Sequence, residues 1–218
     1  MSAAIGVMTR APSSRGKTRL APHLSDERLT SLRAAMLTDT LREASTAAEV
    51  TIFFTPATSD AEIAACAAAT PRVAQCDGDL GARMLGALTH LLETRGSSSA
   101  ILVGSDIAML TADHLGDALA ALQAGGDVVL GPADDGGYYL IGMKQPHAQL
   151  FEAIEWGSDR VLADTLNAAR RGGLDARLIR SAYDIDTIDD LLRLERDLAW
   201  TPAAMCPAVR RWFVHSFS

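Results

Sequence analysis

The chain has 218 residues and a mass of 23.1 kDa, which is enough for one large domain with a substantial hydrophobic core. Its 20 basic and 27 acidic residues give a net charge of −7, and this excess of acid argues against partners such as nucleic acid or an anionic membrane surface. The three cysteines form no CxxC pair, the first residues lack a signal-peptide pattern, and no apolar stretch approaches the roughly 20 residues of a membrane span, so a cytoplasmic protein is expected.

Apolar runs of strand length alternate along the chain with segments of helical periodicity. Strands are predicted at 3–8, 50–54, near Val73, and at 100–104, 127–130, 138–143 and 176–179. Helices are predicted from Ser25 onward, at 60–69, 80–94 and 113–123, twice more before residue 176, and at 188–199. The first helix has an apolar stripe of Leu29, Leu32, Met36, Leu37, Thr40 and Leu41. This pattern predicts a single α/β domain over residues 1–199 with a mostly parallel sheet.

The loop after the first strand, RAPSSRGKTR at 10–19, is strongly basic. It carries Arg10, Arg15, Lys17 and Arg19, and no acidic residue precedes Asp26. Lysine is otherwise rare, since the chain has only Lys17 and Lys144 against 18 arginines. Cations on a glycine-bearing loop that leads into a helix are suited to phosphate oxygens, which predicts a nucleotide-binding loop. A solvated basic loop is the simpler alternative.

The same loop also suggests a second class of enzyme. Gly16-Lys17-Thr18 is the ending of a Walker loop, which would indicate a P-loop NTPase or kinase. However, the first glycine of that motif would fall at Ala11, and Pro12 interrupts the loop. The Walker interpretation is therefore the second choice.

Acidic residues next to the predicted strands point to a divalent metal. Asp106 follows the apolar run 100–104, and open α/β sheets place their ligands at the carboxyl ends of such strands. Mg²⁺, or Mn²⁺ in its place, needs only one or two protein carboxylates when phosphate and water complete its shell. Asp184 and Asp186 in the segment YDIDT are candidates for the second carboxylate. Alternatively, Asp186 and Thr187 merely begin the next helix.

Two more loops and one tryptophan are candidates for ligand contacts. In QCDGDLGAR at 75–83, Asp79 and Arg83 would face a nucleotide, although glycine and aspartate are also common in plain turns. Trp156 would cover the ligand, or act as a packing anchor. Candidates for substrate binding in GPADDGGYY at 131–139 are Asp134, Asp135, Gly136, Gly137 and Tyr138. Hairpin chemistry alone is the alternative explanation of the Asp135-Gly136 pair.

The last segment, 200–218, forms an aromatic and basic tail. It holds four of the 11 aromatic residues, which are Trp200, Trp212, Phe213 and Phe217. It is either a packing arm or a contact in an oligomer such as a homodimer. Elsewhere the sequence contains neither HExxH nor GxSxG, so zinc proteases and triad hydrolases are not supported.

Five ordered motifs together resemble DUF2064, an uncharacterised bacterial family within the GT-A, or nucleotide-diphospho-sugar transferase, superfamily. They are RAPSSRGKTRLAP at 10–22, QCDGDLGARM at 75–84, VGSDIAML at 103–110, GPADDGGYYLIG at 131–142 and YDIDTIDDL at 183–191. The KTRLAP-like loop is also similar to that of guanylyltransferases that activate phospholactate or phosphoenolpyruvate. Two positions differ from the family pattern: Ala108 stands where proline is usual, and Trp156-Gly157-Ser158 stands for Trp-Ser-Thr.

The resemblance implies a Rossmann-like, three-layer α/β/α GT-A fold with a mixed sheet. It implies that Lys17 and its neighbouring arginines bind nucleotide phosphates, that Asp106 and Asp186 hold the metal, and that the DGGYY loop contacts the acceptor or sugar. Lys17, Arg10 and Asp106 are then the expected catalytic residues. The expected activity is metal-dependent transfer of a glycosyl or nucleotidyl group from an NDP-sugar or NTP to a small-molecule acceptor. A non-catalytic nucleotide sensor is the contrasting possibility.

Overall fold

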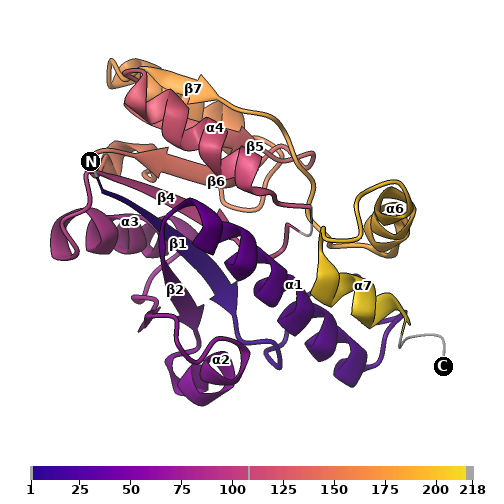
Figure 1. Ribbon diagram of the computed structural model, residues 1–218. Coiled ribbons are helices and arrows are strands. Elements are labelled where there is room, and N and C mark those ends of the chain that lie inside the picture. The colour runs from indigo at the N-terminus through magenta and orange to yellow at the C-terminus, as the bar shows by residue number, and fades with distance from the viewer. Residues whose placement is uncertain (1, 108, 215–218) are drawn as a thin grey trace.

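A single sheet of seven strands organises the part of the chain that the computed structural model describes, residues 2–107 and 109–214 (Figure 1). The strand order is β3-β2-β1-β4-β6-β5-β7. The strands are β1 (Ala3–Arg10), β2 (Glu49–Thr55), β3 (Arg72–Ala74), β4 (Ser99–Gly104), β5 (Val128–Pro132), β6 (Tyr138–Met143) and β7 (Ala176–Leu178). Strand β6 is antiparallel to β4 and β5, and the other pairs are parallel. The predicted α/β class with a mostly parallel, mixed sheet is confirmed.

Helices cover both faces of this sheet and make the three layers. The helices are α1 (Asp26–Ala47), α2 (Asp60–Cys66), α3 (Leu80–Thr89), α4 (Ala112–Gln123), α5 (Val161–Arg171), α6 (Ile188–Ala199) and α7 (Pro207–Val214), with short turns η1 (Ala57–Ser59), η2 (His90–Thr94) and η3 (Ala148–Leu150). Apolar residues of α1 and α4 pack in one core cluster, and those of α3 and α5 pack in the cluster on the opposite face. No helix in the described ranges is long and apolar enough to span a membrane.

Most sequence-based boundaries agree with the structure. The Ser25 side chain accepts a hydrogen bond from the Arg28 amide at 3.3 Å and caps α1, and the whole predicted stripe of that helix is buried. The predicted helix 80–94 is continuous but ends in the π-helical turn η2. One of the two helices expected between 144 and 175 is α5, whereas the other is only the three-residue turn η3. Ala108 and residues 215–218, including Phe217 of the tail, lie outside the described residues.

The tail contains a helix, α7, which was not predicted and which packs against α1. Ala208, Val209 and Trp212 are buried there. The carboxylate of the buried Asp39 on α1 accepts hydrogen bonds from the Ala208 amide at 3.1 Å and the Val209 amide at 2.9 Å. Because Cys206, directly before the helix, has no side-chain oxygen, Asp39 supplies the N-terminal cap from another helix.

Asp39→Ala is therefore expected to lower the free energy of unfolding by about 1–3 kcal/mol, since two buried amides lose a charged acceptor. Urea denaturation followed by tryptophan fluorescence measures this loss. Arg211→Ala changes an exposed side chain of the same helix and serves as the control, with an expected change within about 0.5 kcal/mol. Equal urea midpoints for Asp39→Ala and the unmodified chain would contradict the role of Asp39.

Candidate functional site

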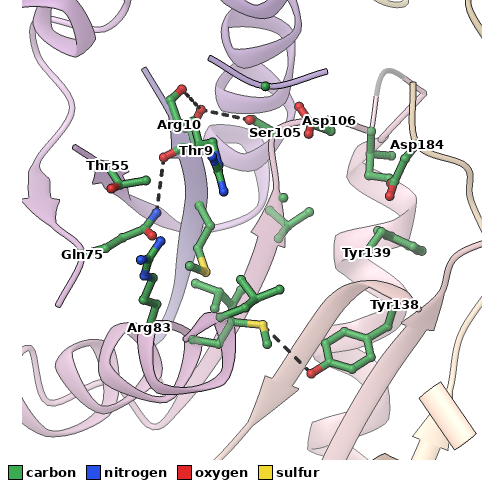
Figure 2. A pocket seen from close by; sticks show the side chains of 18 of the residues that line it. Thr9, Arg10, Thr55, Gln75, Arg83, Ser105, Asp106, Tyr138, Tyr139 and Asp184 are labelled. Carbon is green, nitrogen blue, oxygen red and sulfur yellow. Dashed lines mark hydrogen bonds between the residues drawn. The ribbon is translucent and has the colours of Figure 1, made fainter. Parts of the chain in front are cut away.

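A cavity of about 690 Å³ opens at the carboxyl edge of the parallel strands. From β1 the chain proceeds outward to β2 and β3, and it then returns to place β4 on the other side of β1. In open α/β sheets, ligands bind at this kind of topological switch point. Figure 2 shows polar side chains from the ends of several strands facing the cavity. The fold thus gathers residues far apart in sequence at one edge.

The ends of β1 and β4 are tied together beneath the cavity. The Ser105 hydroxyl donates to Thr9 Oγ1 at 2.9 Å, and the Ser105 amide donates to the Met8 carbonyl at 3.1 Å. These bonds fix the spacing between Arg10, the last residue of β1, and Asp106, two residues past the end of β4. A cationic group and an acidic group therefore face the same space from neighbouring strands (Figure 2).

Three aspartates meet on the acidic side of the cavity. The Ile185 amide donates to the Asp106 carbonyl at 3.2 Å, and the Ile185 side chain is fully buried. This contact brings the flanking residues Asp184 and Asp186 to the cavity wall beside Asp106. Burial, together with the negative charges of Asp106, Asp135 and Asp186, raises the pKa of Asp184 to about 7. The site is thus locally rich in negative charge.

Lys17 lies between two of these carboxylates. Its ammonium is 3.3 Å from Asp106 Oδ2 and 3.1 Å from Asp186 Oδ1, and it donates to the Ile185 carbonyl at 2.5 Å. The Lys17 side chain is only 4% exposed, whereas those of Asp106 and Asp186 are about half exposed, at 51% and 48%. The ammonium therefore offsets the repulsion between the two carboxylates while leaving part of each accessible to a ligand.

The opposite side of the cavity is formed by the end of β3 and the start of α3. The Gln75 side-chain amide donates to the Phe53 carbonyl at 2.9 Å and the Thr9 carbonyl at 3.3 Å, which holds it across the strand ends. Arg83 Nε donates to the Gly78 carbonyl at 3.0 Å, and Figure 2 shows its side chain on the same side of the cavity as Gln75. Apolar side chains of Met84, Leu102 and Ile141 also line the cavity. This side combines hydrogen-bonding groups with an apolar wall.

Some of the predicted site residues line this cavity and others do not. Those that line it are Arg10, Lys17, Arg83, Asp106, Tyr138 and Asp186. Those that lie outside its wall are Arg15, Arg19, Asp79, Asp134, Asp135, Gly136, Gly137 and Trp156. The Thr187 side chain accepts from the Asp190 amide at 3.2 Å, so the helix cap predicted at Thr187 is confirmed.

The residues outside the wall have other contacts. Asp79 accepts from the Ala82 amide at 2.8 Å and caps α3. Asp134 pairs with Arg193 at 2.8 Å. Asp135 accepts from the Gly137 amide at 2.9 Å and closes the turn between β5 and β6. Arg15 and Arg19 are exposed on their loop.

Trp156 packs as part of an aromatic cluster. Its ring stacks on Phe151 with centroids 6.5 Å apart and meets the edge of Tyr138 at the same centroid distance. A Cβ at Gly81 would lie 2.7 Å from Trp156 Cζ2, so the ring lies directly against the first turn of α3. Trp156 thus supports Tyr138 and α3, both of which contribute to the cavity.

Sequence reasoning missed Arg33 and Gln75, and chose Asp186 over Asp184 where both are present. Arg33 lies four residues after Leu29 and four before Leu37, on the stripe that the helical period assigns to the buried face. A charged residue on the buried face of a helix could have indicated that Arg33 has a partner or a ligand there. Gln75 carried no comparable signal, because only the pairing of β2 and β3 brings it to the end of β1.

The donor set suits a divalent cation held partly by its substrate. Among the described residues no group of three or more His, Cys, Asp or Glu side chains forms a complete metal cage. Asp106 and Asp186 nevertheless present partly exposed carboxylates to one cavity, beside an Asp184 whose pKa is raised first by burial and then by the neighbouring carboxylates. Mg²⁺ bound through one or two carboxylates, with phosphate oxygens and water as its other ligands, fits this arrangement.

The loop that carries Lys17 differs from a Walker loop. In a Walker loop, the lysine and the following hydroxyl residue open the helix. Here residues 18–24 form turns, and α1 begins only at Asp26. Lys17 itself has a positive φ of 49° and directs its ammonium to the acidic side of the cavity. The geometry therefore gives no support to the P-loop interpretation.

Comparison with known families and structures gives consistent results. The model of the family described as "Uncharacterized protein conserved in bacteria (DUF2064)" matches residues 38–158. A crystal structure from Desulfovibrio desulfuricans G20, provisionally assigned as a nucleotide-diphospho-sugar transferase, superposes with a TM-score of 0.85 at 27% identity, covering 97% of this chain and 95% of that one. No protein of curated function matches the sequence.

More distant structures share the fold. CMP:2-keto-3-deoxy-manno-octonic acid synthetase complexed with CTP has a TM-score of 0.58 at 13% identity, covering 92% of this chain and 99% of that one. Another is glucosyl-3-phosphoglycerate synthase from Mycobacterium tuberculosis, in complex with Mn²⁺, UDP and glucosyl-3-phosphoglycerate. It has a TM-score of 0.54 at 12% identity, covering 94% of this chain and 80% of that one. The expected nucleotide-diphospho-sugar transferase fold is confirmed.

Proposed function

This chain belongs to the DUF2064 family of proteins conserved in bacteria, and on that premise we propose that it is a metal-dependent transferase that passes a glycosyl or nucleotidyl group from a nucleotide substrate to a small-molecule acceptor. One observation carries the proposal. The cationic residues Arg10 and Lys17 and the carboxylates of Asp106 and Asp186 face one cavity at the switch point of the sheet. Phosphate groups and a divalent cation need these two kinds of partner side by side.

The cations and carboxylates have distinct roles in this proposal. Arg10 and Lys17 bind the phosphate oxygens and stabilise the negative charge that develops on the leaving group. Asp106 and Asp186 hold Mg²⁺ or Mn²⁺, which when bound neutralises phosphate charge and orients the donor. Two structures that share the fold, one complexed with CTP and the other with Mn²⁺ and UDP, support the choice of ligand class.

The remaining walls of the cavity suit the nucleoside and the acceptor. Arg83, Gln75 and the apolar side chain of Met84 form a surface for the nucleoside. Tyr138, from the start of β6, lines the cavity and would contact the sugar or acceptor (Figure 2). Holding both reactants in line next to the phosphate supplies much of the rate increase in group transfer.

A thermal-shift panel of NTPs and NDP-sugars, each with and without Mg²⁺, tests this function. A ligand that binds only the native state raises the melting temperature, so at least one nucleotide is expected to do so more strongly with Mg²⁺ present. The stabilising nucleotide is then incubated with a panel of hydroxylated and phosphorylated acceptors. Binding without transfer to any acceptor would favour a nucleotide sensor, and no shift with any nucleotide would overturn the proposal.

A further inference from the structure

Arg33, on α1, joins the basic loop to the cavity. Its Nη1 donates hydrogen bonds to the Pro12 carbonyl at 3.2 Å and to the Ser14 carbonyl. These two acceptors lie on the loop between Arg10 and Lys17. One end of the guanidinium is thus committed to holding that loop in place.

The other end of the guanidinium faces the cavity. Arg33 is among the lining residues, and a Cβ at Gly16 would lie 2.7 Å from Arg33 Nη2, so the glycine leaves the space that the group occupies. Among the described residues, Nη2 and Nε have no hydrogen-bond acceptor in the protein. Burial lowers the pKa of Arg33, as does the charge of Arg10, while Asp106 and Asp186 oppose this shift. The Arg33 guanidinium therefore interacts electrostatically with both the basic and the acidic residues of the site.

We propose that Arg33 is a phosphate-binding residue of this site, and that its Nη2 and Nε groups donate to the phosphate oxygens of the nucleotide while Nη1 fixes the loop. The proposal rests on the proposed function. Guanidinium suits this double role because its donors are held in a rigid plane and can serve two partners at once. An ammonium carries its donors on a single nitrogen and lacks the planar spread of a guanidinium, so it spans two separate partners less well.

Glu62 on α2 provides a matched control, because it anchors the same loop from outside the cavity. Its carboxylate accepts from the Ser13 amide at 2.6 Å and from the Ser13 hydroxyl at 2.7 Å. Glu62 is not among the lining residues. Removing it loosens the loop without removing a donor from the cavity, which separates phosphate binding from loop ordering.

The test measures binding of inorganic tripolyphosphate with Mg²⁺ by calorimetry, so that the identity of the base does not matter. Arg33→Met is expected to raise the Kd roughly 10- to 100-fold, as for the loss of hydrogen bonds to a charged partner, and Arg33→Lys should restore part of the affinity. Glu62→Ala should change the Kd by less than about 3-fold, although it exposes the loop to faster trypsin cleavage after Arg15.

Gly16→Ala gives a second variant that keeps every charge. Its methyl group would displace Arg33 Nη2, and the positive φ of 156° at Gly16 adds backbone strain, so it should weaken tripolyphosphate binding in the otherwise unmodified chain and cost less in Arg33→Met, where the clash with Nη2 is absent. Unchanged affinity in Arg33→Met, or an equal loss in Glu62→Ala, would overturn the role of Arg33 while leaving the proposed function intact. Absence of binding to the unmodified chain would instead overturn both.

Discussion

Asp106→Asn is expected to lower the rate of group transfer by roughly 10²- to 10³-fold, the size of effect seen when one preorganised electrostatic group is lost from an active site. Asparagine keeps the shape of the side chain but removes the charge that attracts a divalent cation. The Asp106 side chain is half exposed, so its replacement should cost little folding stability. Steady-state kinetics over a range of Mg²⁺ concentrations measures the effect.

The control for this variant is Asp117→Asn. Asp117 is a partly exposed residue of α4 that pairs with Arg180 and is not among the lining residues. The control variant should retain nearly full activity. If Asp106→Asn kept near-normal turnover with an unchanged requirement for Mg²⁺, Asp106 would not be a metal ligand. A matching melting temperature for the two variants would show that any loss of activity is chemical.

Lys17→Met is expected to cause a similar loss of turnover, and to weaken nucleotide binding, because a cation is removed from the phosphate site. The same substitution should strengthen metal binding, in contrast to its effect on nucleotide binding. In the structure the ammonium lies 3.3 Å from Asp106 Oδ2 and 3.1 Å from Asp186 Oδ1, so it competes with a divalent cation for these two carboxylates. Without the lysine, Mn²⁺ alone should bind more tightly, which electron paramagnetic resonance can measure.

Lys144 is the other lysine in the chain and is exposed at the end of β6, which makes Lys144→Met a direct control. That variant should bind nucleotide and Mn²⁺ as the unmodified chain does. Weaker binding of Mn²⁺ in Lys17→Met would contradict competition between the ammonium and the metal. Unchanged nucleotide affinity would contradict a role for Lys17 at the phosphates.

Local patterns predicted the fold well, because its elements depend on neighbouring residues. The stripe of α1 and its cap at Ser25 follow from helical spacing and from a side chain three residues from its partner. The cap of α7 could not be predicted in this way. Its acceptor, Asp39, is 169 residues away from Ala208 in sequence, and only the packing of two helices brings them together.

The site was predictable where its residues follow directly from a strand. Arg10 was chosen as part of a basic loop that directly follows a strand, and Asp106 as an acid just past a parallel strand, and both side chains line the cavity. Arg33 and Gln75 reach the cavity from a helix face and from an edge strand, through contacts that depend on strand order. Trp156 and Asp135 were chosen by residue type, and the structure places both outside the cavity wall.

The most direct measurement of the central claim is phosphorus NMR of the reaction between the stabilising nucleotide, Mg²⁺ and an acceptor. Metal-dependent transfer predicts one of two product patterns: release of pyrophosphate, which marks nucleotidyl transfer, or release of a nucleoside diphosphate, which marks glycosyl transfer. Either should require both the acceptor and Mg²⁺, and should be nearly absent in Asp106→Asn. Hydrolysis of the nucleotide at the same rate with and without acceptor would contradict the account.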